Sequence, residues 1–124
     1  MPITTTIFPK ENLTVFTGEG EISYSEAWEA MSRDYRSINP GTTRNILWDL
    51  RNTSLASLTA SQVTKLADLS VNYSKQRGGG KTAIVAPHDL NFGVAKEFEG
   101  QSKTISREFI IFRHFDEAKK WLEE

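Results

Sequence analysis

The sequence predicts an α/β domain built on a mixed five-stranded sheet covered by helices. Hydrophobic periodicity alternates in order between the two-residue repeat of strands and the 3.6-residue repeat of helices. Two hydroxyl residues stand three positions before a Glu or a Gln, a spacing typical of helix starts. The 124 residues and 14.0 kDa are enough to bury one core and too few for two. We therefore expect residues 1–124 to form a single domain.

The chain opens with two short runs that are rich in β-branched and aromatic residues, Ile3–Phe8 and Leu13–Thr17. Four residues separate them, and this arrangement predicts a β-hairpin. Gly18 and Gly20 follow the second run and are expected to end that strand. The hairpin also predicts an exposed sheet edge, whose unpaired backbone groups favour a homodimer.

Two helices are expected to begin at capping boxes, in which a hydroxyl and a Glu or Gln each accept a free backbone N–H. The pairs are Ser23 with Glu26 and Thr59 with Gln62, and each precedes residues with helical hydrophobic spacing. Segments rich in glycine or proline are expected to stop both helices: Asn39-Pro-Gly41 and Gly78-Gly-Gly80.

Three more apolar runs are predicted as strands: Asn45–Leu50, Lys81–Ala86 and Glu108–Phe112. Asp89 and Asp116 follow the last two runs and are expected to cap two further helices. Strands that alternate with helices pair in parallel through right-handed crossovers. The predicted sheet is therefore parallel except for its first strand, which the hairpin adds in the antiparallel sense.

Composition excludes several classes of function. Fifteen Lys and Arg against sixteen Asp and Glu leave a net charge of −1, so no basic excess is available to bind nucleic acid. Cysteine is absent, which excludes disulfides and thiol catalysis. The N-terminus lacks a signal-peptide pattern and no apolar run is long enough for a membrane span. We expect a soluble, cytoplasmic protein.

No constellation of residues predicts catalysis, a metal site or a cofactor. His88 and His114 are the two histidines, and neither has a second ligand at metal-binding spacing. Both are expected to cap helix starts or to face solvent. The segment Arg77-Gly-Gly-Gly-Lys-Thr82 lies between a helix and a strand, the reverse of the order in a phosphate-binding loop. The sequence therefore predicts a protein that is not an enzyme.

From residue 45 onward the chain resembles the SpoIIAA-like group of STAS-type domains. The segments that carry the resemblance are Ile46–Leu50, Ala83–Pro87, Phe92–Ala95 and Phe112–Ala118, the last leading to Trp121-Leu122. The resemblance implies a small non-catalytic domain. Members of the wider fold act as regulatory partners of other proteins, as appendages of anion transporters, or as binders of small or lipid-like molecules. The SpoIIAA-like group is also compared with CRAL-TRIO lipid-binding domains.

The sequence departs from the phosphorylated STAS proteins at their regulatory motif. Those proteins carry a phosphorylatable serine in an Asp-Ser-x-Gly motif after a strand that ends in Asp-Leu. Counted from Asp49-Leu50, the serine position falls on Leu58 and the aspartate position on Ser57. The family's switch is therefore not carried over. Ser54 and Ser57 stay candidate phosphorylation sites because their loop leads into a helix start, where phosphate is well stabilised.

Two functions remain open. The first is binding of a small apolar or lipid-like ligand near the carboxyl ends of the strands, between the 51–59 loop and the 86–93 turn. The residues predicted for this site combine aromatic walls, a charged or polar rim and a glycine early in a helix: Trp28, Arg51, His88, Phe92 and Gly93. The alternative is a protein–protein regulatory module that is controlled by phosphorylation in the loop after the third strand.

Overall fold

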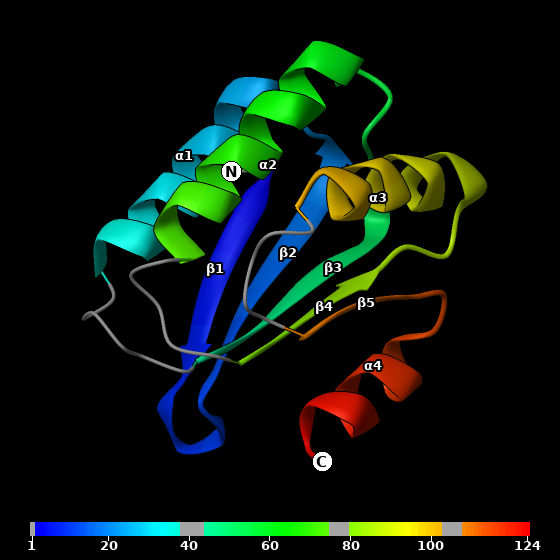
Figure 1. Ribbon diagram of the computed structural model, residues 1–124. Helices are drawn as coiled ribbons and strands as arrows, with labels where there is room; N and C mark the ends of the chain where they lie inside the picture. The colour runs from blue at the N-terminus through cyan, green and yellow to red at the C-terminus, as the bar shows by residue number, and fades with distance from the viewer. Residues whose placement is uncertain (1, 38–43, 75–79, 103–107) are drawn as a thin grey trace.

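The computed structural model describes residues 2–37, 44–74, 80–102 and 108–124 (Figure 1). It confirms an α/β fold with a mixed five-stranded sheet and four helices. The strands are β1 (Ile3–Phe8), β2 (Leu13–Glu21), β3 (Asn45–Ser54), β4 (Lys81–Val85) and β5 (Glu108–Phe112). The helices are α1 (Tyr24–Ser37), α2 (Ala60–Ser74), α3 (Asp89–Gln101) and α4 (Phe115–Leu122), and a short 3₁₀ turn (Pro9–Glu11) joins β1 to β2.

The strands lie in the sheet in the order in which they occur along the chain, from β1 to β5. As predicted, β1 pairs with β2 in the antiparallel sense and the other neighbours pair in parallel. Right-handed crossovers that always step in the same direction place their helices on the same face. Figure 1 shows this result, with α1, α2 and α3 along one side of the sheet and α4 on the other.

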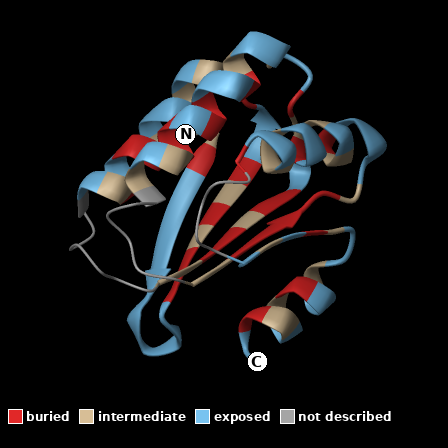
Figure 2. Ribbon diagram, in the orientation of Figure 1, coloured by how far each residue is buried: buried red, intermediate tan, exposed pale blue. Residues whose placement is uncertain are grey.

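Each face of the sheet has its own apolar cluster, because successive strand residues point to opposite faces. In β3, Ile46 packs under the layer of α1, α2 and α3, whereas Leu47 packs against α4 through Ala118 and Leu122. Figure 2 shows the buried residues gathered in the central strands, while β1 is exposed along most of its length. The helix layer is thus the main cover of the sheet.

The second and third strands are longer than the sequence predicts. Gly18 and Gly20 do not end β2, which runs on through a β-bulge to Glu21 and pairs with an extension of β3 that reaches Ser54. Gly18 fits this stretch because a Cβ there would lie 2.8 Å from the Cδ1 of Ile22. Gly20 has a φ of +67°, a backbone conformation that favours glycine. Here glycine permits a bulge instead of stopping the strand.

Both capping boxes are confirmed. The Ser23 Oγ accepts the N–H of Glu26 at 3.2 Å, and the Glu26 carboxylate accepts the N–H of Ser23 at 2.8 Å. Thr59 and Gln62 make the same pair of hydrogen bonds at 3.2 and 3.0 Å. The helix stops predicted at residues 39–41 and 78–79 lie outside the described residues.

The two predicted aspartate caps are wrong by one or two positions. His88 and His114 occupy the N-cap positions of α3 and α4, and both are exposed, without a side-chain hydrogen bond to the cap. Asp89 and Asp116 instead lie in the first turns of these helices. A carboxylate there still interacts favourably with the helix dipole, so both positions suit a helix start.

Asn91 in α3 joins the end of β3 to the helix layer. Its side chain is 2% exposed, donates to the Thr53 carbonyl at 2.8 Å and accepts the N–H of Leu55 at 3.0 Å. The backbone turns out of the sheet at this point, so these two polar groups lack a strand partner. Asn91 satisfies both and thereby sets the path of the following loop.

We predict that Asn91→Ala lowers the free energy of unfolding by about 2–5 kcal/mol, because it leaves two buried backbone groups without a partner. Urea unfolding would measure this change. The matched control is Asn72→Ala, an exposed asparagine of α2, for which a change within about 0.5 kcal/mol is expected. Equal effects of the two substitutions would contradict the assigned role of Asn91.

A second prediction concerns the first capping box. The hydrogen bond that the Ser23 backbone N–H donates to the Glu26 carboxylate lowers the pKa of Glu26 below its ordinary value, and the hydrogen bond with the Ser23 side chain lowers this pKa further. A carboxyl whose pKa is lowered in the folded state stabilises the fold at pH values above its ordinary pKa. This stabilisation is lost as the pH falls through the lowered pKa.

Glu26→Gln keeps an oxygen acceptor but cannot ionise. The wild type should therefore melt at a higher temperature than Glu26→Gln near neutral pH, and the difference should be smaller at an acidic pH below 4.5, the ordinary value of the Glu pKa. Thermal melts monitored by circular dichroism at both pH values would show this. Glu97→Gln, an exposed change within α3, is the control. A difference that stays constant with pH would refute the prediction.

Candidate functional site

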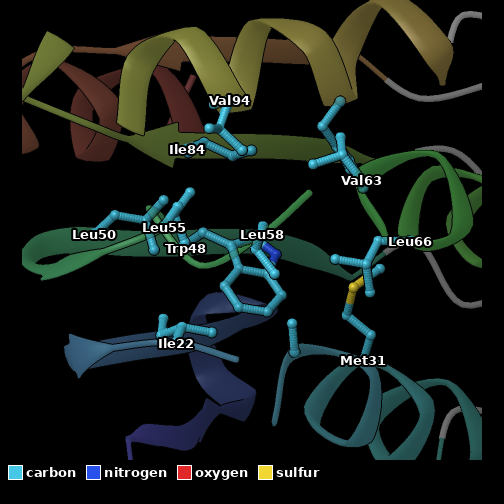
Figure 3. Close-up of a pocket in the computed structure, with 13 residues that line it drawn as sticks. Ile22, Met31, Trp48, Leu50, Leu55, Leu58, Val63, Leu66, Ile84 and Val94 are labelled. Atoms are coloured by element: carbon cyan, nitrogen blue, oxygen red, sulfur yellow. The ribbon is translucent and has the colours of Figure 1, made fainter. Parts of the chain in front are cut away.

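An apolar pocket lies between the helix layer and the sheet. Its volume is about 80 Å³, and it is partly open to solvent. Figure 3 shows Met31 and Leu66 at one end, Leu50 and Leu55 at the other, and the ring of Trp48 between them. All thirteen lining residues are apolar or aromatic: Ile22, Ala27, Met31, Trp48, Leu50, Leu55, Leu58, Val63, Leu66, Ile84, Val94, Ala95 and Phe98.

Regular spacing in each element points these side chains at one space. Ala27 and Met31 are four residues apart on α1, and Val63 and Leu66 are three apart on α2, so each pair shares a helix face. In β3 the alternate residues contribute, beginning with Trp48, because they point to the same sheet face. The sequence therefore builds the pocket from the same repeats that build the core.

Trp48 lies in the middle of the pocket wall. Its ring stacks on Phe16 of the neighbouring strand, with ring centroids 4.3 Å apart and planes 18° apart. Phe16 is 1% exposed, so the indole rests on a fixed support. Among the thirteen lining residues of the described chain, Trp48 is the one whose side chain carries an N–H donor. It is the group that can orient a ligand with a polar atom.

The loop between β3 and α2 supplies Leu55 and Leu58 to the pocket and is held in place by polar contacts. Asn91 fixes its start. The Ser57 hydroxyl donates to the Ile22 carbonyl at 2.8 Å, and the Ser54 Oγ accepts the N–H of Ala56 at 3.1 Å. Both candidate phosphorylation sites therefore already make hydrogen bonds, Ser54 within the loop and Ser57 to the segment between β2 and α1, and their modification stays a prediction.

None of the five residues that the sequence predicts for the site lines this pocket. Trp28 is 38% exposed beside Tyr24, with ring centroids 5.8 Å apart. Phe92 packs against the edge of the core under the guanidinium of Arg113, which lies 4.0 Å from its ring centroid. His88 is exposed at the start of α3. Their assignment as ligand contacts stays a prediction.

Gly93 does not mark a close approach within the protein. A Cβ built at this position would meet no atom within 4 Å in the described chain, so alanine would fit there. Gly93 is exposed, and the structure gives no packing reason for glycine in this helix.

Arg51 lies on the other face of the sheet, beside α4. Its guanidinium donates to both oxygens of Asp49 at 2.9 Å and lies 4.1 Å from the ring centroid of Phe115. The hydrogen bonds that Arg51 donates to the Asp49 carboxylate raise the pKa of Arg51. Asp49 is 7% exposed, so its charge needs this partner. The contact joins the end of β3 to the start of α4 and lies across the sheet from the pocket.

Two properties of the described residues bear on the class of site. Within residues 2–37, 44–74, 80–102 and 108–124, no three His, Cys, Asp or Glu side chains converge as metal ligands. Over the same ranges, no helix has both the length and the apolar character needed to cross a membrane.

Sequence reasoning missed the pocket as a site, although the strands and helices that it predicted contain most of the lining residues. A run of apolar residues at helical or strand spacing predicts burial, but it does not tell a filled core from one with a space in it. The small residues Ala27 and Ala95 are the signal that was available, since each leaves room where a larger side chain would fill the layer.

Comparison with known proteins identifies the fold. No family model and no curated protein matches the chain. A solved structure does match: an uncharacterised DUF3478-family protein with a SpoIIAA-like fold, from Shewanella loihica PV-4. The TM-score is 0.55 and the sequences are 19% identical, over 97% of this chain and 91% of the other. Identity this low carries the fold alone. The chain therefore has the SpoIIAA-like fold that its sequence resembles.

Proposed function

We propose that this chain is a non-catalytic domain that binds a small apolar or lipid-like ligand in the pocket between the helix layer and the sheet. The observation that carries the proposal is the lining, in which thirteen apolar or aromatic residues surround a partly open space. Ligand pockets are mostly apolar, with a few polar groups that fix orientation. The N–H of Trp48 is such a group.

The size of the pocket limits the ligand. About 80 Å³ is roughly half of the 150 Å³ cavity that holds benzene in a small protein. About three CH₂ groups would fit, and their burial contributes only about 2.4 kcal/mol. This is less than the 4.1 kcal/mol of a millimolar complex. A ligand that binds tightly must therefore be longer than the pocket and extend from its open side, as an alkyl chain can.

The chemistry of the lining supports binding over catalysis. General acid–base catalysis needs a titratable side chain within hydrogen-bond reach of the reacting group. No residue in the described lining carries a carboxylate, an imidazole or an amine. What this wall offers is apolar contact and one hydrogen-bond donor.

We predict that a chain alcohol such as 1-hexanol shifts the indole N–H resonance of Trp48 in a ¹H–¹⁵N NMR titration. The other tryptophans are internal controls, because Trp28 is exposed on α1 and Trp121 belongs to α4, across the sheet from the pocket. Their resonances should stay in place. Mass spectrometry of the gently purified protein would identify a ligand already bound.

Ala95→Leu provides the test variant, since it adds a larger side chain to the pocket wall. This variant should fold, show no shift of the Trp48 resonance when 1-hexanol is added, and yield no bound ligand in mass spectrometry. Ala60→Leu, an exposed change at the start of α2, should leave both readouts unchanged. If Ala95→Leu fails to fold, Ala27→Leu at the opposite wall replaces it. Equal shifts of all three indoles, or no shift and no bound ligand in the wild type, would overturn the proposal.

A further inference from the structure

The outer edge of β1 is an open strand edge with its hydrogen-bonding groups aimed away from the sheet. β1 ends the strand order, and its register with β2 pairs Ile3 with Gly18 and Phe8 with Leu13. The N–H of Glu19 donates to the Pro2 carbonyl at 2.7 Å, so residue 2 is in a hydrogen-bonded pair with β2.

Hydrogen-bonded and non-hydrogen-bonded pairs alternate along an antiparallel ladder. From residue 2 onward, the even-numbered residues of β1 therefore bond to β2. The odd-numbered residues, Ile3, Thr5 and Ile7, turn their N–H and C=O groups outward. Strand edges of this kind are templates for pairing with another chain.

The edge carries none of the usual protection against such pairing. Natural edges are blocked by charged residues, proline or bulges. Residues 3–8 contain neither a charge nor a proline, and the register of β1 with β2 is uninterrupted. By contrast β5, at the other end of the sheet, begins with the exposed Glu108.

The sequence of this edge is symmetric. Residues 3–7 read Ile-Thr-Thr-Thr-Ile, so they are the same in both directions around Thr5. An antiparallel pair of two β1 strands centred on Thr5 would place Ile3 opposite Ile7 and Thr4 opposite Thr6. Each pair then shares a face and a chemical type, which is what favours cross-strand contact. Ile7 is 45% exposed in the single chain and would gain an apolar partner.

The helix beside this edge has a charge pattern that suits the same symmetry. A groove of about 360 Å³ lies between β1 and α1, and its helix wall carries Glu26, Glu29 and Arg33. α1 runs in the direction of β1, so two copies related by a two-fold axis at Thr5 would have antiparallel α1 helices. Glu26, near the start of one helix, would then lie toward Arg33 of the other, which pairs with Glu29 of its own chain at 3.1 Å. Such self-complementarity is required of a two-fold interface.

We infer that the partner of the β1 edge is a second copy of this chain, which joins two sheets into one of ten strands. The outward groups of Ile3, Thr5 and Ile7 allow two backbone hydrogen bonds in each of three residue pairs. This assignment does not depend on the ligand pocket, which lies under the helix layer.

Two kinds of variant test the inference, with molar mass measured by light scattering over about three decades of protein concentration. The wild type should pass from monomer to dimer. Thr5→Pro removes an outward N–H and should weaken the dimer about tenfold or more, while the fold survives because no bond to β2 is lost. Ile110→Lys, on the exposed face of the opposite edge strand, should dimerise as the wild type does. A wild type that stays monomeric throughout would overturn the inference, as would equal effects of the two substitutions.

Single cysteines give a second test that does not depend on the fold of Thr5→Pro, since the chain has no cysteine of its own. At the symmetry centre the two residues 5 lie about 5.5 Å apart between Cα atoms, within disulfide reach. The Cα atoms of the two Thr4 residues are diagonal neighbours across the strand pair, about 7–8 Å apart, which is too far for a disulfide. Under mild oxidation Thr5→Cys should cross-link to a dimer and Thr4→Cys should not. Equal cross-linking of the two exposed positions would contradict the proposed register.

Discussion

The handedness of the strand crossovers is the constraint on which the rest of this structure depends. Each parallel strand is added beside the previous one, and a right-handed connection leaves only one face of the sheet for the intervening helix. Three helices therefore share one face, and the last helix covers part of the other. This asymmetry places the apolar pocket on the face that the three helices cover. It also leaves β1 at the edge with little cover.

Polar contacts at the ends of the strands hold this arrangement in register. Asn91 ties the end of β3 to α3, and the Asp49–Arg51 pair ties the same strand to α4 through Phe115. The Asn91 contacts lie at the carboxyl end of β3, and the Asp49–Arg51 pair lies a few residues before it on the α4 face of the sheet. The buried groups of such contacts are costly to leave unpaired, so they favour one packing of the helices over its alternatives.

Local rules predicted the parts of the fold that depend on neighbours in the chain. The hairpin and both capping boxes follow from spacings of a few residues, the parallel pairing of the later strands follows from their alternation with helices, and all are confirmed. The failures lie where a distant partner decides. Gly18 looked like a strand end, yet pairing between β2 and β3 carries the strand through it. Asn91 gave no signal, because its two partners are 36 and 38 residues away in the sequence.

The candidate site was the harder prediction for the same reason. The sequence predicted a site beside the 51–59 loop, and two residues of this loop, Leu55 and Leu58, line the pocket. It could not locate the space itself, which depends on how three helices and a sheet leave a volume between them. That space has an energetic consequence. Enclosed unfilled volume costs about 24 cal/mol per Å³, so about 80 Å³ sets an upper value of about 2 kcal/mol for this partly open space. This is a large share of the 5–15 kcal/mol that holds a small domain folded. A single larger residue at Ala27 or Ala95 would fill much of this space and remove much of that cost. A domain with a purely structural role would therefore be more stable without the pocket.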